Sequence, residues 1–210
     1  VDGLAFAEKA LAAAPPPVNA PEWLYLKANC ERQLLKNEQA VQTYAGLLKA
    51  RPASSFSDKA RYELALTFYR MGDYSNAVVE AAKVKFVDSR RKDVYWLLAE
   101  AHSALKNADS AIQYYRLITM DYPDSDVACD ATYRLAHYLQ QKGELKEAAR
   151  YYAMVESRFP SNKLAPTALF AAASCNSRLG ATEDAVRDWT SMVLKYPADP
   201  LAEQACYQKA

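Results

Sequence analysis

Apolar residues recur three and four positions apart along most of the chain, which is the spacing of one face of an α-helix. Between Tyr62 and Val84 this spacing holds as far as Met71, stops at Gly72, and resumes at Ala77. A break of this kind predicts two helices joined by a tight turn, because glycine readily adopts the left-handed conformation that ends a helix. No segment shows the alternation of a β-strand, so the pattern predicts an all-α protein.

The pattern also repeats. Proline stands at positions 52, 123, 160 and 197, and Ser89 takes the place of a proline between the first two. An alanine lies twelve residues before each of these five positions and another alanine lies twelve residues before that, so successive repeats are spaced by 37, 34, 37 and 37 residues. The first-helix alanines are Ala28, Ala65, Ala99, Ala136 and Ala173, and the second-helix alanines are Ala40, Ala77, Ala111, Ala148 and Ala185.

Small residues at both positions let two antiparallel helices approach closely, and larger residues fill the flanks. We expect four second-helix aromatic residues to pack against the neighbouring unit, whereas the second unit has Ala81 at this position. The turn between the two helices has glycine in three units and Lys36-Asn37 or Lys106-Asn107 in the other two. The three glycines are Gly72, Gly143 and Gly180, and the four aromatic residues are Tyr44, Tyr115, Tyr152 and Trp189.

A single helix pair cannot bury its apolar face, so the pairs are expected to stack into one solenoid over residues 1–210. Pro15, Pro16 and Pro17 lengthen the first connection, and Ala210 falls where the first-helix alanine of a further unit is due. The chain is therefore expected to be a fragment of a longer array. The expected segments are 1–19 (second helix of a partial repeat), five repeats at 20–56, 57–90, 91–127, 128–164 and 165–201, and the start of another repeat at 202–210.

The charge balance and the absence of catalytic motifs exclude several classes of function. The chain has 26 basic and 25 acidic residues and a formal net charge of +1. We find no local basic patch, and so expect no nucleic-acid partner and no membrane insertion. Sequence motifs for nucleotide binding, serine hydrolysis and zinc proteolysis are absent, which predicts a protein that is not an enzyme and has no cofactor. Asp121, Asp124, Asp126 and Asp130 suggest calcium, but they lack the glycine and glutamate of an EF-hand, and no metal site is expected.

The first-helix small residue, the second-helix Ala-x-x-x-aromatic pattern and the closing proline together resemble the tetratricopeptide repeat over the whole chain. Units of 37 residues and segments such as Lys195-Tyr196-Pro197 resemble its bacterial cell-envelope branch, which includes the Tol-Pal cell-division coordinator and the outer-membrane assembly lipoprotein. The resemblance implies a right-handed superhelical solenoid of antiparallel helix pairs and a non-catalytic protein-binding scaffold. It favours a periplasmic or outer-membrane-associated location and leaves a cytoplasmic one open.

In solenoids of this type, first-helix residues three before and one after the small alanine line a concave groove. The first position is aromatic throughout: Tyr25, Tyr62, Trp96, Tyr133, Phe170 and Tyr207. The second holds Asn29, Leu66, Glu100, His137 and Ser174, and one turn further lie Arg32, Arg70 and Arg178. Aromatic residues make good peptide contacts, so we expect this groove to bind a protein or peptide partner. Packing between helices is the other explanation of the aromatic series, and both roles remain open.

Two other functions remain open at this stage. The array is also compatible with a regulatory or targeting module of a larger protein whose catalytic, pore-forming or secretion domain lies outside this sequence. Self-association is the third possibility, and it predicts a mass in solution that increases with concentration.

Overall fold

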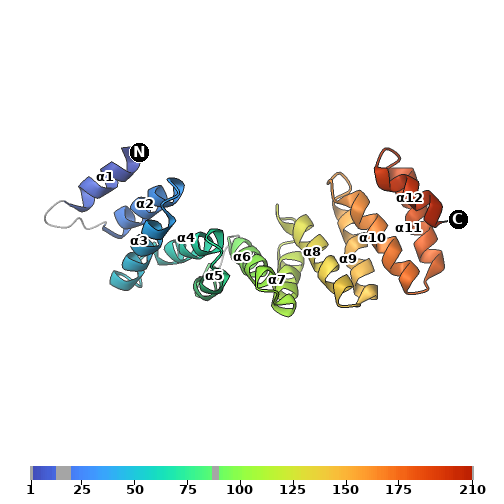
Figure 1. Cartoon of the computed structure of the whole chain (residues 1–210), viewed down its shortest axis with the longest axis horizontal. Helices are drawn as coiled ribbons and strands as arrows, with labels where there is room; N and C mark the ends of the chain where they lie inside the picture. The colour runs from blue at the N-terminus through green and yellow to red at the C-terminus, as the bar shows by residue number, and fades with distance from the viewer. Residues whose placement is uncertain (1, 13–19, 87–89, 210) are drawn as a thin grey trace. The chain divides into compact units, whose positions relative to one another are not determined.

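The structure is a computed structural model that describes residues 2–12, 20–86 and 90–209. The described residues form twelve helices and no strand, which confirms the all-α prediction (Figure 1). Ser89, Pro15, Pro16, Pro17 and Ala210, which the sequence analysis singled out, lie outside the described residues. None of the helices within these ranges is long and apolar enough to cross a membrane.

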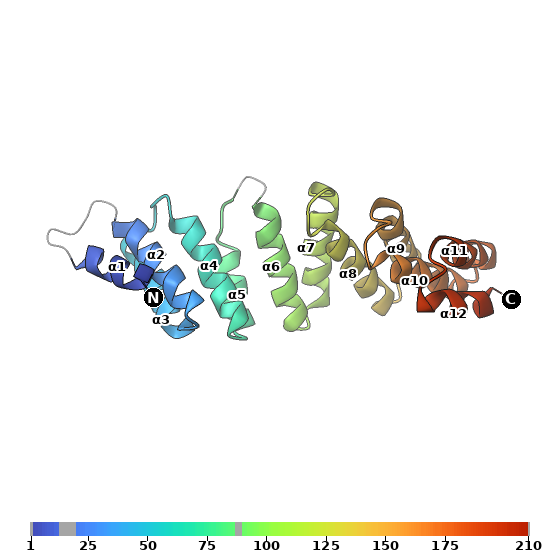
Figure 2. The same cartoon turned by 90° about the horizontal axis from the view of Figure 1, so that it is seen from above.

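The helices fall into two compact units, residues 1–107 and 108–210, and the division lies inside the expected repeat 91–127. Consecutive helices pack against one another within each unit, in pairs joined by short turns (Figures 1 and 2). The first unit contains α1 (Asp2–Leu11), α2 (Ala20–Gln33), α3 (Asn37–Ala50), α4 (Ser57–Arg70), α5 (Tyr74–Ala81) and α6 (Arg91–Ala104). The second contains α7 (Ala108–Asp121), α8 (Ala128–Gln141), α9 (Leu145–Arg158), α10 (Ala165–Arg178), α11 (Thr182–Lys195) and α12 (Pro200–Gln208).

The alanines that define the repeat are buried. All ten are at most 1% exposed, as expected for residues at the point where two helices approach closely. Around them pack larger side chains such as Leu47 and Leu64 in the first unit and Met192 in the second. Within each unit, the alanines are thus surrounded by larger apolar side chains, and burial of this apolar surface drives the packing of the helices.

The second-helix aromatic residues are buried, as predicted. Tyr44, Tyr115, Tyr152 and Trp189 are at most 5% exposed. The Tyr115 ring stacks on Tyr138 of the following helix at 6.1 Å between centroids. The Tyr44 and Tyr152 hydroxyls instead donate hydrogen bonds back to the first helix of their own pair, as buried phenols usually must.

The turns inside the pairs follow the glycine pattern with one correction. Gly72, Gly143 and Gly180 have φ values of 81°, 81° and 75°, in the left-handed region. The other two turns place Leu35 (φ 60°) and Lys106 (φ 58°) in the same conformation. The expectation of Lys36-Asn37 was therefore off by one residue in the first turn, where a leucine adopts a conformation that is unfavourable for any side chain with a Cβ.

Candidate functional site

The predicted aromatic series lies on the even-numbered helices, at the sixth residue of α2, α4, α6, α8 and α10 and at the eighth residue of α12. We call the surface of α2, α4 and α6 in the first unit, and that of α8, α10 and α12 in the second, the first-helix face. Tyr25, Tyr62, Trp96, Tyr133 and Phe170 are half-buried, whereas Tyr207 is 75% exposed. These rings therefore have one side against the protein and one side open to solvent.

In the first unit, two of these rings pack against residues of the following connection. The Tyr25 ring lies 5.5 Å from the Phe56 ring, and the Tyr62 ring lies 6.1 Å from the Phe86 ring. Burial raises the pKa of Tyr62 to about 12, because the ionised phenolate is poorly solvated there. Tyr25, Tyr62 and Phe86 line a pocket of about 290 Å³ together with Lys59, Glu63, Arg90 and Asp93.

Several polar side chains of the first-helix face in the first unit bond to other residues of the protein. The Tyr44 hydroxyl donates to Asn29 Oδ1 at 2.8 Å, and Arg32 forms an ion pair with Glu63 of the next first helix at 3.2 Å. Burial is the main reason that the pKa of Tyr44 is raised, and the Glu63 carboxylate adds to it. Asn29 and Arg32 thus already have partners inside the protein, and a ligand that used them would compete with those partners.

In the second unit, the aromatic residues again contact buried second-helix rings. The Tyr133 ring packs edge-on against the Tyr152 ring, with 5.4 Å between the centroids. Burial raises the pKa of Tyr133. Phe170 packs against the cluster that contains Trp189. Ser174 donates its hydroxyl proton to the Phe170 carbonyl at 2.9 Å, within its own helix. The aromatic positions therefore have a packing role in both units, which supports one of the two explanations left open by the sequence.

A pocket of about 410 Å³ opens on α8, on the first-helix face of the second unit. The predicted residues Tyr133 and His137 line it, one helical turn apart, and His137 is exposed. Its other lining residues are Asp130, Arg134, Tyr138, Gln141 and Leu164. We call this pocket the α8 pocket; it combines aromatic rings, a cation, a carboxylate and amide groups.

The remaining predicted residues are dispersed. Leu66, Trp96 and Glu100 are half-buried, and Arg70 and Arg178 are exposed at the C-terminal ends of α4 and α10. Sequence reasoning missed five of the seven α8-pocket residues. Four of these five are on α8, and Asp130, Arg134 and Gln141 lie three or four positions from a predicted residue, so helical periodicity around Tyr133 and His137 would have found them. Leu164 precedes α10, and its place in the α8 pocket is apparent only from the fold.

The described residues give no group of three or more His, Cys, Asp and Glu side chains that could hold a metal ion. The four cysteines are free: Cys129 and Cys175 are buried, Cys30 is half-buried and Cys206 is exposed. Burial raises the pKa of Cys129 to about 11, which leaves this thiol protonated and unreactive at neutral pH. His102 is half-buried, and its pKa is lowered by desolvation.

The tetratricopeptide repeat family matches residues 25–86, 62–126 and 133–202, and the chain belongs to this family. No curated protein sequence matches the chain. Among solved structures, YrrB, described as a TPR protein with an unusual peptide-binding site, is 18% identical, with 97% of this chain and 96% of YrrB covered and a TM-score of 0.65. A MamA structure from Desulfovibrio magneticus RS-1 is 20% identical, with 76% and 85% covered and a TM-score of 0.61.

A third similar structure is that of Naa15/Naa10 bound to HypK-THB. It is 16% identical, with a TM-score of 0.63, and it covers 98% of this chain but 30% of the matched chain. At these identities the likeness concerns the fold, which is that of tetratricopeptide repeat proteins.

Proposed function

We propose that the chain is a non-catalytic scaffold that binds a peptide or an extended segment of a protein partner on its first-helix face, with the α8 pocket as the main contact. The observation that carries the proposal is the coincidence of this pocket with Tyr133 and His137, two residues of the predicted groove. YrrB, a relative in fold, is described as having a peptide-binding site, and this supports the same class of function here.

The chemistry of the α8 pocket suits a peptide. A half-buried tyrosine ring offers apolar contact area that is already ordered, so little conformational entropy is lost on binding. Arg134 and Asp130 can pair with side chains of either charge, and Gln141 can donate to and accept from a peptide backbone. The first-unit pocket at Tyr25 and Tyr62 has the same combination of rings and charges, and is a separate site of the same kind.

The test is crosslinking from the α8 pocket. A photo-crosslinking amino acid replaces His137, which is exposed and lines the pocket, and the matched control replaces Ala153, an exposed residue of α9 that does not line it. We expect one discrete partner from position 137 and none from position 153. The crosslinked partner segment is then synthesised and titrated against the native chain and a His137→Ala, Gln141→Ala variant.

The titration decides the proposal. We expect the double substitution to weaken binding by roughly tenfold, a typical loss for contacts inside a peptide groove, while circular dichroism shows unchanged helicity. Equal capture from both positions, or equal affinity of the native and substituted chains, would exclude the α8 pocket as the partner site.

We further propose that the scaffold works in a bacterial envelope assembly. The support for this context is the sequence resemblance of the repeats to envelope tetratricopeptide proteins, and the similar solved structures add nothing to it. Fractionation of the source cells tests it: a periplasmic or outer-membrane fraction is expected. Recovery with cytoplasmic proteins, or within a larger polypeptide that carries a catalytic or pore-forming domain, would favour the alternative of a targeting module.

A further inference from the structure

A second surface, distinct from the α8 pocket, results from a short helix in the α4/α5 pair. The helix α5 has eight residues, whereas α3, α7, α9 and α11 have fourteen each. It ends at Ala81, the position where the other second helices carry a buried aromatic residue. The chain then leaves the helix through Ala82 and Lys83. The last turns of a full-length second helix are therefore absent from this pair.

The residues that replace those turns are cationic. At the position of Lys85, three other second helices have the buried residues Leu48, Thr119 and Glu156, and α11 has the half-buried Val193. Lys85 is exposed, and so is Lys83. The space beside α4 is open as a cavity of about 560 Å³, lined by Pro52, Ser54, Ser57, Arg61, Lys83 and Lys85, among others. We call this cavity the α4 cleft.

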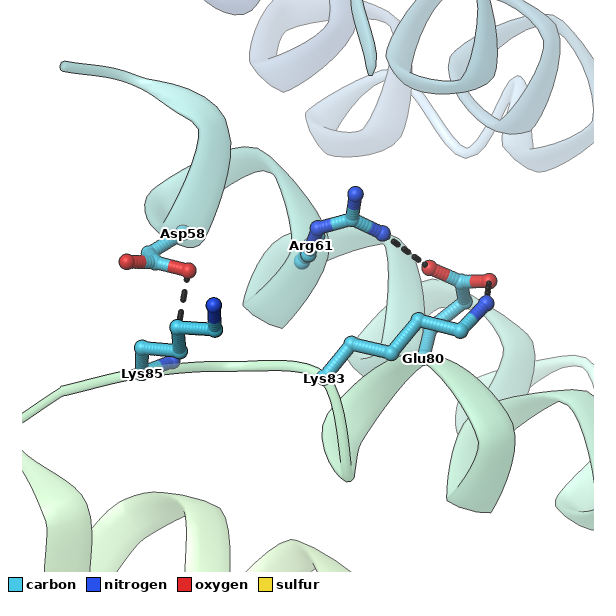
Figure 3. Close-up of polar contacts among 5 residues, drawn as sticks. All are labelled: Asp58, Arg61, Glu80, Lys83 and Lys85. Atoms are coloured by element: carbon cyan, nitrogen blue, oxygen red, sulfur yellow. Dashed lines mark hydrogen bonds and ion pairs between the residues drawn. The ribbon is translucent and has the colours of Figure 1, made fainter. Parts of the chain in front are cut away.

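The charges in the α4 cleft are only partly neutralised. Arg61 and Lys83 approach the Glu80 carboxylate from two sides, at 3.1 and 2.6 Å (Figure 3). Asp58 accepts a hydrogen bond from the backbone N–H of Lys85 at 3.2 Å. Among the described residues, the Lys85 ammonium group has no ion-pair partner. Two cations thus share one carboxylate, and a third cation faces the open space.

The α4 cleft is part of a larger basic surface. The ends of α3 and α5 and the starts of α4 and α6 lie on one edge of the first unit (Figure 2). Residues 49–61, 80–86 and 90–93 there carry nine lysines and arginines against three acidic residues, while the whole chain has a formal net charge of only +1. The sequence analysis did not recognise this local excess of cations, because it draws on three segments that are separated in the sequence.

We propose that the α4 cleft binds an acidic segment of a protein partner through carboxylates placed on Arg61, Lys83 and Lys85. Asp58 and Glu80 stand between these cations, and they would repel a nucleic acid or an anionic membrane, whose phosphates are closely and evenly spaced. Acidic side chains of a peptide can avoid these two positions, and its backbone N–H groups can donate to them. The site is independent of the α8 pocket, so either proposal can fail without the other.

The probe is a fluorescein-labelled peptide of alternating Glu and Ser, amidated at its C terminus so that only side-chain carboxylates are offered. Its binding to the full chain is followed by fluorescence anisotropy at low and at physiological salt. We expect Lys83→Gln with Lys85→Gln to weaken binding by roughly fivefold, because two exposed ion pairs are lost, and we expect binding to weaken as salt is raised.

The matched control is Lys146→Gln with Lys163→Gln, which removes the same charge from exposed positions of the second unit. We expect this variant to bind like the native chain. No binding by the native chain, or equal losses in both variants, would overturn the proposal. A labelled single-stranded oligonucleotide or phosphatidylserine vesicles that bind more tightly than the peptide, and that lose binding with Lys83→Gln and Lys85→Gln, would also overturn it in favour of a polyphosphate surface.

Discussion

The α4/α5 and α8/α9 pairs are built on the same alanines but differ in their second helix. In α9, Tyr152 is buried against Tyr133, and the helix spans fourteen residues, Leu145–Arg158. In α5, Ala81 stands at the equivalent position, and the helix ends there after eight residues. A large buried ring provides apolar contacts for the last turns of a second helix, and without it those turns have less to pack against. The α8/α9 pair therefore has a packed interior, whereas the α4/α5 pair has an open cleft lined by charged residues.

The largest expected effect on stability comes from removing the Tyr152 ring. Tyr152→Ala should lower the free energy of unfolding of the second unit by about 4 kcal/mol, because it leaves a cavity in a fully packed site and leaves Gln140 without its hydrogen bond. Urea unfolding followed by circular dichroism measures it. Tyr152→Phe is the control and should lose about 1 kcal/mol. A loss below about 1 kcal/mol for Tyr152→Ala would mean that the ring does not hold α9 in place.

The reverse substitution tests the other side of the comparison. Ala81 is fully buried, so Ala81→Tyr should force neighbouring side chains apart and destabilise the chain by about 2 kcal/mol. The same urea experiment measures it, and Ala82→Tyr, at an exposed position, is the control. A gain in stability with Ala81→Tyr would show instead that the ring can enter the α4 cleft and extend α5.

Substitutions in one turn of each unit should change the stability by smaller amounts and in opposite directions. Gly143→Ala should cost about 1 kcal/mol, since φ is 81° and no atom lies within 4 Å of the added Cβ, so the cost is conformational. Leu35→Gly should add about 1 kcal/mol, because the leucine is 83% exposed and has little packing to lose. Shifts in the urea midpoint measure both. A destabilising Leu35→Gly would indicate that the Leu35 side chain makes contacts in the folded chain.

The smallest expected effect appears in alkaline solution. Tyr62, which packs on Phe86 after the short α5, ionises near pH 10 in the unfolded chain and near pH 12 in the folded chain. The unfolded chain therefore loses its proton first, and stability falls as the pH rises from 10 to 12. Tyr62→Phe should lose less stability over this range than the native chain. Identical profiles would mean that the phenol is as well solvated in the folded state as in the unfolded one.

Most of the architecture could be predicted from the sequence, because the repeat multiplies a weak local signal. The ten alanines identify the helix crossings, and the glycines at 72, 143 and 180 identify the turns. The left-handed turn at Leu35 was missed, since local residue type gives no sign of it, although counting 37 residues back from Gly72 would have found it. Periodicity also located Tyr133 and His137 of the α8 pocket, but not Leu164, which lies in the turn before α10.

Periodic spacing along the chain is enough to locate the helices, the turns, the crossings between paired helices and the face on which an aromatic series lies. The packing of the helices is needed to show which of those residues have a partner inside the protein and which face solvent. Arg32 forms an ion pair with Glu63, whereas His137 is exposed. The same packing also decided that cations from the ends of α3 and α5 and the starts of α4 and α6 share one edge. The physical reason is that burial, ion pairing and electrostatic fields depend on distances in space, and residues far apart in sequence set those distances only once the helices have packed.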